Sequence, residues 1–139
     1  MISFKKVLIP IDFSDWSKRA LGACSTMFAG NEPMAFHFVF VLRAPSDYAP
    51  LAQGRTREMH EQLQEFVSEF THQGEHVTHV EILTGQPAMA LCKYARDHEC
   101  DLIAMATHGR TGLAHMLIGS TAEQVVRHAP CPVLSLRFV

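Results

Sequence analysis

The sequence predicts an α/β protein: a doubly wound, Rossmann-like three-layer sandwich built on a five-stranded parallel sheet. Three observations carry this prediction. Short apolar segments alternate with longer segments of helical periodicity from one end of the chain to the other. The apolar segments are apolar on both faces, as strands are when helices cover both sides of a sheet. The 139 residues contain no Pro/Gly/Ser-rich linker, so we expect one domain, 1–139.

The first half of the chain contains two strand-helix units. Lys5–Asp12 (KKVLIPID) is a short β-branched apolar run, and it predicts the first strand. In the helix that follows, Ser14 is placed to cap the first turn and Gly30 to end the last one. Met34–Leu42 (MAFHFVFVL) predicts a second strand. After a loop with two prolines, residues 55–73 carry apolar side chains on one helical face, which predicts a single helix.

The second half continues the alternation. His76–Leu83 predicts the third strand, and a helix follows it near Pro87, where a missing N–H costs little. Asp101–Thr107 and Pro132–Leu136 predict the last two strands, with a helix over Ser120–Ala129 between them. Right-handed crossovers leave few arrangements of five such strands, and we expect the order 3-2-1-4-5.

A ligand crevice is expected where the winding of this sheet reverses, between the first and fourth strands. Asp12 follows the first strand, and the segment Ala106–Gln124 (ATHGRTGLAHMLIGSTAEQ) follows the fourth. Gly109 and Gly112 are expected to allow positive φ, so that backbone N–H groups reach an anion. The amides and the dipole of the helix that starts after Gly119 also favour an anion. The segment therefore predicts a phosphate site.

The same segment also has an explanation without a ligand. Ser120 and Glu123 have capping-box spacing, with Ser120 as the expected N-cap, and their side chains would then satisfy the first backbone donors of the helix. The spacing matches neither G-x-G-x-x-G nor a P-loop, because no lysine follows Gly119. Spacing alone leaves both alternatives open.

Three segments, VLIPIDFS, DLIAMATHGRTG and IGSTAEQVVRHAPCPVL, together resemble the universal stress protein family, and the resemblance runs the whole chain. The ATP-binding branch of that family carries G-x-x-G, nine residues, and then G-S or G-T. Here Gly109 is the second glycine, Arg110–Ile118 are the nine residues, and Gly119 and Ser120 close the motif. Ala106 stands where the family has its first glycine.

The resemblance implies a site for ATP, with AMP or ADP as alternative ligands. It places the phosphates at Gly109, Gly119, Ser120 and Thr121, the ribose at Asp12 and the backbone of Ala106, and the adenine between Ile11 and Val41. Pro10, Met105, His108 and Arg110 complete the expected nucleotide-binding residues.

Four of these positions carry alternatives. Asp12 has an alternative role in holding Mg²⁺ on the nucleotide, because magnesium favours a carboxylate with phosphate oxygens. His108 either donates to a phosphate or holds its own loop, and Arg110 either pairs with a terminal phosphate or is solvated. At Ala106 a negative φ adds only a methyl group, whereas a left-handed backbone costs about 1 to 2 kcal/mol.

Other classes of site fit the sequence less well. His72, His76 and His79 have no cysteine or carboxylate placed to complete a tetrahedral metal site, so we expect a solvated face there. The net charge of -2, with scattered basic residues, argues against nucleic acid as a partner. The four cysteines form no C-x-x-C pair and are expected to be reduced thiols.

No apolar run approaches the ~20 residues that cross a bilayer, and Met1–Ile11 lacks the pattern of a signal peptide. We therefore expect no membrane contact and a cytoplasmic location. The last strand, PVLSLRFV, has no covering element and forms an exposed edge, and the resemblance implies a homodimer through that edge.

The expected function is an ATP-binding module that acts in stress response or regulation. We do not expect a dedicated enzyme, since no nucleophile and base are placed for phosphoryl transfer. One alternative is a dimeric interaction protein with an empty crevice. The other is an enzyme that slowly hydrolyses ATP or phosphorylates itself.

Overall fold

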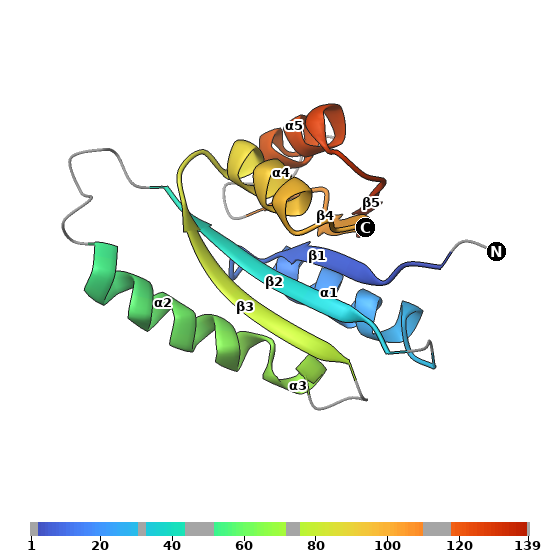
Figure 1. The fold of residues 1–139 in the computed structure, drawn as a ribbon, viewed down its shortest axis with the longest axis horizontal. Coiled ribbons are helices and arrows are strands. Elements are labelled where there is room, and N and C mark those ends of the chain that lie inside the picture. The colour runs from blue at the N-terminus through green and yellow to red at the C-terminus, as the bar shows by residue number, and fades with distance from the viewer. Residues whose placement is uncertain (1–2, 31–32, 44–51, 72–75, 110–117, 139) are drawn as a thin grey trace.

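A five-stranded parallel sheet in the order β3-β2-β1-β4-β5 forms the centre of the protein (Figure 1). The computed structural model describes residues 3–30, 33–43, 52–71, 76–109 and 118–138. The strands are β1 (Lys6–Pro10), β2 (Ala35–Leu42), β3 (Val77–Thr84), β4 (Leu102–Ala106) and β5 (Val133–Leu136). The helices are α1 (Asp15–Met27), α2 (Ala52–Phe66), α3 (Ser68–Thr71), α4 (Pro87–Asp97) and α5 (Ser120–His128). The α/β class and the strand order expected from the sequence are confirmed.

Helices cover both faces of the sheet and divide the core into two clusters. On one face, α1, α2 and α3 bury Cys24, Leu63 and Phe70 against β2. On the other face, α4 and α5 bury Leu91 and Val125 against β1, β2 and β4. Figure 1 shows α4 and α5 together on one side of the sheet, with α2 and α3 on the other. The molecule therefore has the three expected layers.

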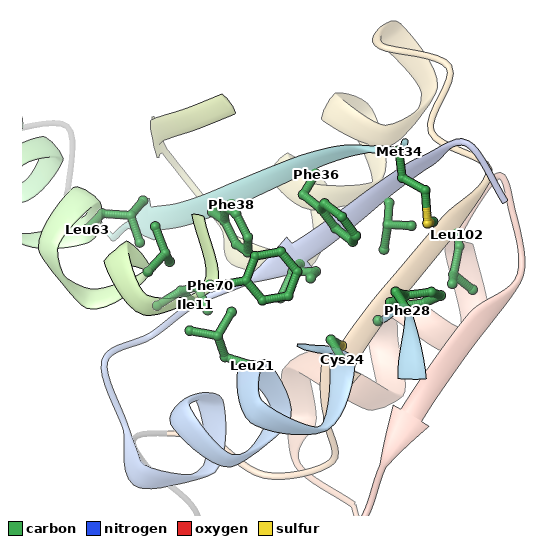
Figure 2. Close-up of a cluster of buried hydrophobic side chains, with 14 of the residues drawn as sticks. Ile11, Leu21, Cys24, Phe28, Met34, Phe36, Phe38, Leu63, Phe70 and Leu102 are labelled. Atoms are coloured by element: carbon green, nitrogen blue, oxygen red, sulfur yellow. The ribbon is translucent and has the colours of Figure 1, made fainter. Parts of the chain in front are cut away.

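The first of these clusters is rich in aromatic rings. Phe36 and Phe38 of β2 are fully buried, and the ring centroid of Phe70 lies 4.7 and 5.1 Å from theirs at steep angles. Figure 2 shows these three rings grouped between β2 and the helices, with Leu63 and Leu21 beside them. Edge-to-face aromatic pairs of this kind add to the stability that buried area provides. The same cluster buries Ile9 of β1 and Ile11 directly after it.

Several helix ends match the sequence expectations. The Ser14 side chain accepts a hydrogen bond from the Ser17 amide and caps α1, and Gly30 has a φ of +81° just beyond the helix. Pro87 occupies the first turn of α4, after Gln86, whose side chain accepts a bond from the Met89 amide. These local signals therefore determined where α1 and α4 begin.

The single helix expected over residues 55–73 is wrong. The chain instead forms α2 from Ala52 and a short α3 to Thr71, with a turn at Val67. Val67 is fully buried, and its amide still donates to the Leu63 carbonyl at 3.1 Å. Leu63, Val67 and Phe70 are spaced as i, i+4 and i+7 on one helical face, and all three are buried in the core, so the break at Val67 leaves the predicted apolar stripe in place. None of the helices in the described ranges is long and apolar enough to span a bilayer.

Candidate functional site

A cavity of about 600 Å³ opens at the carboxyl ends of β1, β2 and β4, where the sheet reverses its winding. Its size falls within the range of small-molecule sites. Every expected site residue that the structure describes lines it: Pro10, Ile11, Asp12, Val41, Met105, Ala106, His108, Gly109, Gly119, Ser120 and Thr121. Arg110 and Gly112 lie outside the described residues. The sequence therefore located the cavity, while the role of each residue in binding stays a prediction.

Asp12 is held at the mouth of the cavity by two serines. Its Oδ1 accepts hydrogen bonds from the Ser14 amide at 3.0 Å, the Ser14 hydroxyl at 2.5 Å and the Ser17 hydroxyl at 2.8 Å. The Ser17 hydroxyl also accepts from the Asp12 amide at 3.1 Å, and Ser17 is only 4% exposed. Bonds to an ionised carboxylate are stronger than neutral ones, so these contacts fix the orientation of Asp12.

A left-handed residue makes the turn that brings these serines to Asp12. Phe13 has a φ of 65°, which is uncommon for a residue with a side chain and costs about 1 kcal/mol or more. Its ring lies 5.0 Å from the Phe40 ring and 5.4 Å from the Phe66 ring, centroid to centroid. Packing between β2 and α2 therefore holds a strained backbone directly beside the carboxylate that lines the cavity.

Gly109 and Gly119 are needed for space, and the expectation of positive φ at Gly109 is wrong. Positive φ among the described glycines occurs at Gly30 and Gly85. A Cβ at Gly109 would lie 2.5 Å from Asp12 Oδ2. A Cβ at Gly119, whose φ is -73°, would lie 3.0 Å from the Thr107 carbonyl oxygen. The Gly119 amide donates to that same oxygen at 2.5 Å. Both glycines thus permit close approach of chain segments rather than a left-handed turn.

The start of α5 differs from the capping box expected at Ser120 and Glu123. The N-cap is Gly119, which has no side chain to cap the helix, and Ser120 is the exposed first helical residue. Glu123 pairs with Arg127 at 2.9 Å one turn later. The displacement follows from the close contact of Gly119 with Thr107, which places the cap one residue earlier. The capping box expected at Ser120 is therefore wrong, and Ser120 and Thr121 bring the start of α5 to the cavity wall.

Ala106 ends β4 in extended conformation, paired in register with Leu136 of β5. Among the described residues other than glycine, positive φ occurs at Phe13 and Glu99. Alanine in place of the first motif glycine therefore adds a methyl group to the cavity wall without backbone strain.

His108 follows β4 on the same wall. Its Nδ1 lies 3.1 Å from the Thr107 hydroxyl, and its ring centroid lies 5.4 Å from that of Trp16. These contacts support the loop-holding role that the sequence offered for His108, and they leave donation to a phosphate as a prediction.

The cavity also contains residues that sequence reasoning missed: Ser17, Val39, Phe40, Leu42, Arg43, Pro87, Leu91, Thr107 and Ala122. Arg43 follows β2 directly, so the strand-end argument that identified Val41 also applies to it. Pro87 and Leu91 belong to α4, and no sequence signal shows that this helix reaches the crevice. Buried apolar residues such as Leu91 and Met105 give the cavity a floor suited to a flat, largely apolar ring.

Several described histidines outside the cavity have structural contacts. His76 Nδ1 accepts from the Met34 amide at 2.9 Å, and His79 stacks on His37 at 4.5 Å. Burial, followed by the nearby charges of His79, His98 and Lys6, lowers the pKa of His37 to about 4. In the part of the chain that the structure describes, no group of three metal-ligating side chains occurs, and His72 lies outside that part.

The cysteines are free thiols, as the sequence led us to expect. Burial raises the pKa of Cys24 to about 12 and that of Cys100 to about 11. Both groups are therefore protonated and unreactive at neutral pH.

Comparison with known proteins now decides the family. The model of the universal stress protein family matches residues 3–137. The chain belongs to the universal stress protein family. Universal stress protein MJ0531 of Methanocaldococcus jannaschii is 34% identical to it over 143 residues, which cover 96% of this chain and 82% of that protein.

Solved structures of universal stress proteins share the fold. The structure of MJ0577 from the same organism aligns with a TM-score of 0.86 at 26% identity, covering 99% of both chains. A universal stress protein in complex with cAMP aligns at 0.74 and 20% identity, covering 96% of this chain and 97% of that one. A family member from Arabidopsis thaliana with AMP bound aligns at 0.66 and 19% identity, covering 97% and 92%. Some structural relatives therefore bind adenine nucleotides on this fold.

Proposed function

We propose that this universal stress protein binds an adenine nucleotide, with ATP as the leading ligand, in the cavity at the carboxyl ends of β1, β2 and β4. One observation carries the proposal. An oriented carboxylate, an apolar floor and a helix start without a side-chain cap line one cavity of suitable volume. Relatives with bound AMP and cAMP support an adenine nucleotide over other anionic ligands.

The start of α5 would hold the phosphates. The first amides of a helix have no partners within the helix, and the macrodipole places roughly half a positive charge at that end. Ser120 and Thr121 add hydroxyl groups on the cavity wall. Gly109 and Gly119 keep the approach to these amides free of side chains, which is the arrangement that the family motif implies.

The ribose would contact a charged side chain of the cavity, and the adenine would contact apolar ones. Asp12 Oδ2 faces Gly109, because its Oδ1 is turned to Ser14 and Ser17, and Oδ2 would accept from a ribose hydroxyl or ligate Mg²⁺ on the nucleotide. Ile11 and Val41 would flank the adenine above the apolar floor. AMP and ADP would use the same ribose and adenine contacts with fewer phosphate contacts.

Binding would act through linkage rather than turnover. A ligand that binds only the native state stabilises it, and the stabilised conformation then presents a particular surface to a partner. The sequence places no nucleophile and base together for phosphoryl transfer, and Oδ1 of Asp12 accepts hydrogen bonds from Ser14 and Ser17. We therefore propose a binding module in stress response or regulation, and not a dedicated ATPase or kinase.

Two further expectations complete the proposal. The sheet ends at β5, and we propose that a second copy of the chain pairs along that edge to form a homodimer. We also propose that the protein works in the cytoplasm, where free thiols such as those of its four cysteines stay reduced.

The test is a set of thermal melts and calorimetric titrations with ATP, ADP, AMP and cAMP, with and without Mg²⁺, and with GTP as a control. At ~100-fold excess over Kd, a ligand of the native state adds about 2.7 kcal/mol, which raises Tm by about 5 to 10 °C for a chain of this size. Absence of a shift at millimolar ATP would favour the alternative of an interaction protein with an empty crevice. Steady release of phosphate from bound ATP would favour the enzyme alternative.

A matched pair of variants tests the site itself. Asp12→Asn keeps the shape of the side chain and removes its charge, and it should weaken ATP at least tenfold because a charge-assisted bond is worth about 1.5 to 3 kcal/mol. Asp15→Asn makes the same change three residues along, at an exposed residue outside the cavity lining, and should leave affinity unchanged. Equal affinities for the two variants would contradict the placement of the ribose.

A further inference from the structure

Three aromatic rings from separate parts of the chain are in contact beside the cavity. Trp16, in the first turn of α1, contacts both of the others. Its ring centroid lies 5.4 Å from that of His108 and 6.5 Å from that of Phe138, with the planes of Trp16 and Phe138 24° apart. The Arg19 guanidinium lies 5.8 Å from the Trp16 ring centroid and 5.3 Å from that of Phe138, and so covers both rings. We call these four residues the Trp16 column.

The two ends of the Trp16 column have different surroundings. His108 lines the cavity and follows β4, whereas Trp16, Arg19 and Phe138 are outside the cavity lining. Phe138 follows β5, whose last residue, Leu136, accepts a backbone hydrogen bond from the Thr107 amide at 3.0 Å. The column thus joins one wall of the cavity to the end of the sheet's last strand.

This arrangement constrains where His108 can stand. Its contact with the Thr107 hydroxyl restricts the ring from one side, and the indole of Trp16 restricts it from another. The indole itself is held by Phe138 and Arg19, since aromatic pairs and a cation over a ring face attract one another. Movement of the His108 ring toward Trp16 would therefore meet an indole that Phe138 and Arg19 hold in place.

We propose that Trp16 is a positioning residue for His108 and that the Trp16 column couples nucleotide occupancy of the cavity to the segment that follows β5. The inference rests on the proposed nucleotide binding, because occupancy of the cavity is one of the two coupled states. The coupling adds a means of regulation: nucleotide in the cavity changes the conformation around Phe138, which the nucleotide does not contact. By reciprocity, if the nucleotide changes the affinity of this segment for a partner, that partner changes nucleotide affinity by the same factor.

Trp16 is the chain's sole tryptophan, so its emission reports on the column alone. The experiment titrates the full chain with ATP while calorimetry and Trp16 fluorescence are recorded in parallel. We expect the emission to change with the same midpoint as the heat signal. Without any nucleotide, His108→Ala should also shift the emission, because it removes one neighbour of the indole.

The decisive comparison is the ATP affinity of variants at Phe138 and Trp16, the residues of the Trp16 column outside the cavity lining. Phe138→Ala should weaken ATP about two- to tenfold, which corresponds to the strength of one aromatic pair, although Phe138 lies outside the cavity lining. Trp16→Leu should weaken ATP similarly, and Trp16→Phe, which keeps a flat ring, should restore affinity to within about twofold. Met27→Ala is the control, since Met27 is an exposed residue of the same helix outside the column.

The outcomes separate this inference from the proposed function. ATP binding by calorimetry with unchanged Trp16 emission would overturn the coupling, as would wild-type affinity in Phe138→Ala or in Trp16→Leu. Calorimetry that detects no ATP binding to the wild-type chain would overturn the proposed function first, and the coupling with it.

Discussion

Replacement of Gly119 by alanine tests whether the glycines of this segment serve close backbone contact. The added Cβ would stand 3.0 Å from the Thr107 carbonyl oxygen and 3.5 Å from the His108 Cα. Both neighbours are backbone atoms, so no flexible side chain can move aside. The φ of Gly119 is -73°, which alanine adopts without strain, and the whole effect of the substitution is therefore steric.

The size of the effect follows from what must move. Ordinary contacts of a Cβ require a few tenths of an ångström more, and the same carbonyl oxygen accepts the Gly119 amide at 2.5 Å. Separation of the two segments weakens that bond, whose net value is about 0.5 to 1.5 kcal/mol, and displaces the start of α5. We expect a fall in stability of about 1 to 2 kcal/mol, or roughly 3 to 6 °C in Tm. We also expect ATP to bind at least tenfold more weakly, because the amides at the start of α5 shift.

Gly22→Ala is the matched control for the same change of residue. Gly22 is an exposed residue inside α1, and a Cβ there would meet no atom within 4 Å. Alanine in a helix interior is favoured over glycine by about 0.5 to 1 kcal/mol, so this variant should melt at a higher temperature and bind ATP unchanged. The assay is thermal denaturation with and without ATP, supported by calorimetry. Wild-type melting and affinity in Gly119→Ala would refute the close-contact explanation.

Three more predictions follow from the site and the core. Gly109→Ala should weaken ATP about tenfold with a smaller change in Tm, because its Cβ would displace Asp12 Oδ2 and not backbone; calorimetry that gives wild-type affinity would contradict this. Ala106→Gly should leave ATP affinity unchanged or improve it, and a clear loss would show that the ribose lies elsewhere. Acidification should destabilise the fold through His37, whose pKa falls to about 4 on folding. The free energy of unfolding keeps its full value above the unfolded pKa near 6.5 and declines as pH drops toward 4. The loss at pH 5 is about 2 kcal/mol. Urea denaturation should therefore show a smaller loss between pH 7 and pH 5 in His37→Gln than in the wild type, and equal losses would exclude His37 as the cause.

The order of the strands could be predicted from the sequence because it depends on two things: how apolar the strands are on each face, and the handedness of the crossovers. Apolar runs too uniform for one-sided strands required helices on both faces, and right-handed crossovers then left little choice of topology. Once the order was set, the position of the crevice followed from the sites where β1 and β4 end. Asp12, Val41 and Gly109 were identified by this argument and by the family motif, and all three line the cavity.

Local signals were weaker where a contact distant in sequence competed with them. Ser120 and Glu123 have capping-box spacing, yet the approach of Gly119 to Thr107 moved the cap by one residue. The apolar stripe over residues 55–73 has helical spacing throughout, yet the structure has a one-residue turn at Val67 between α2 and α3. At the start of α5, packing against the segment after β4 outweighed a local capping preference of about 1 kcal/mol.

By itself the sequence determined the layers, the strand order, the crevice and the family, because hydrophobic periodicity, chain connectivity and a spaced glycine motif are properties of neighbouring residues. Only the tertiary structure decided why Gly109 and Gly119 must lack side chains, that α4 contributes to the cavity, and that Trp16 contacts both His108 and Phe138. Each of these depends on the distance between atoms far apart in the chain. Such distances are set by how whole elements pack, and the pattern within any one element does not contain them.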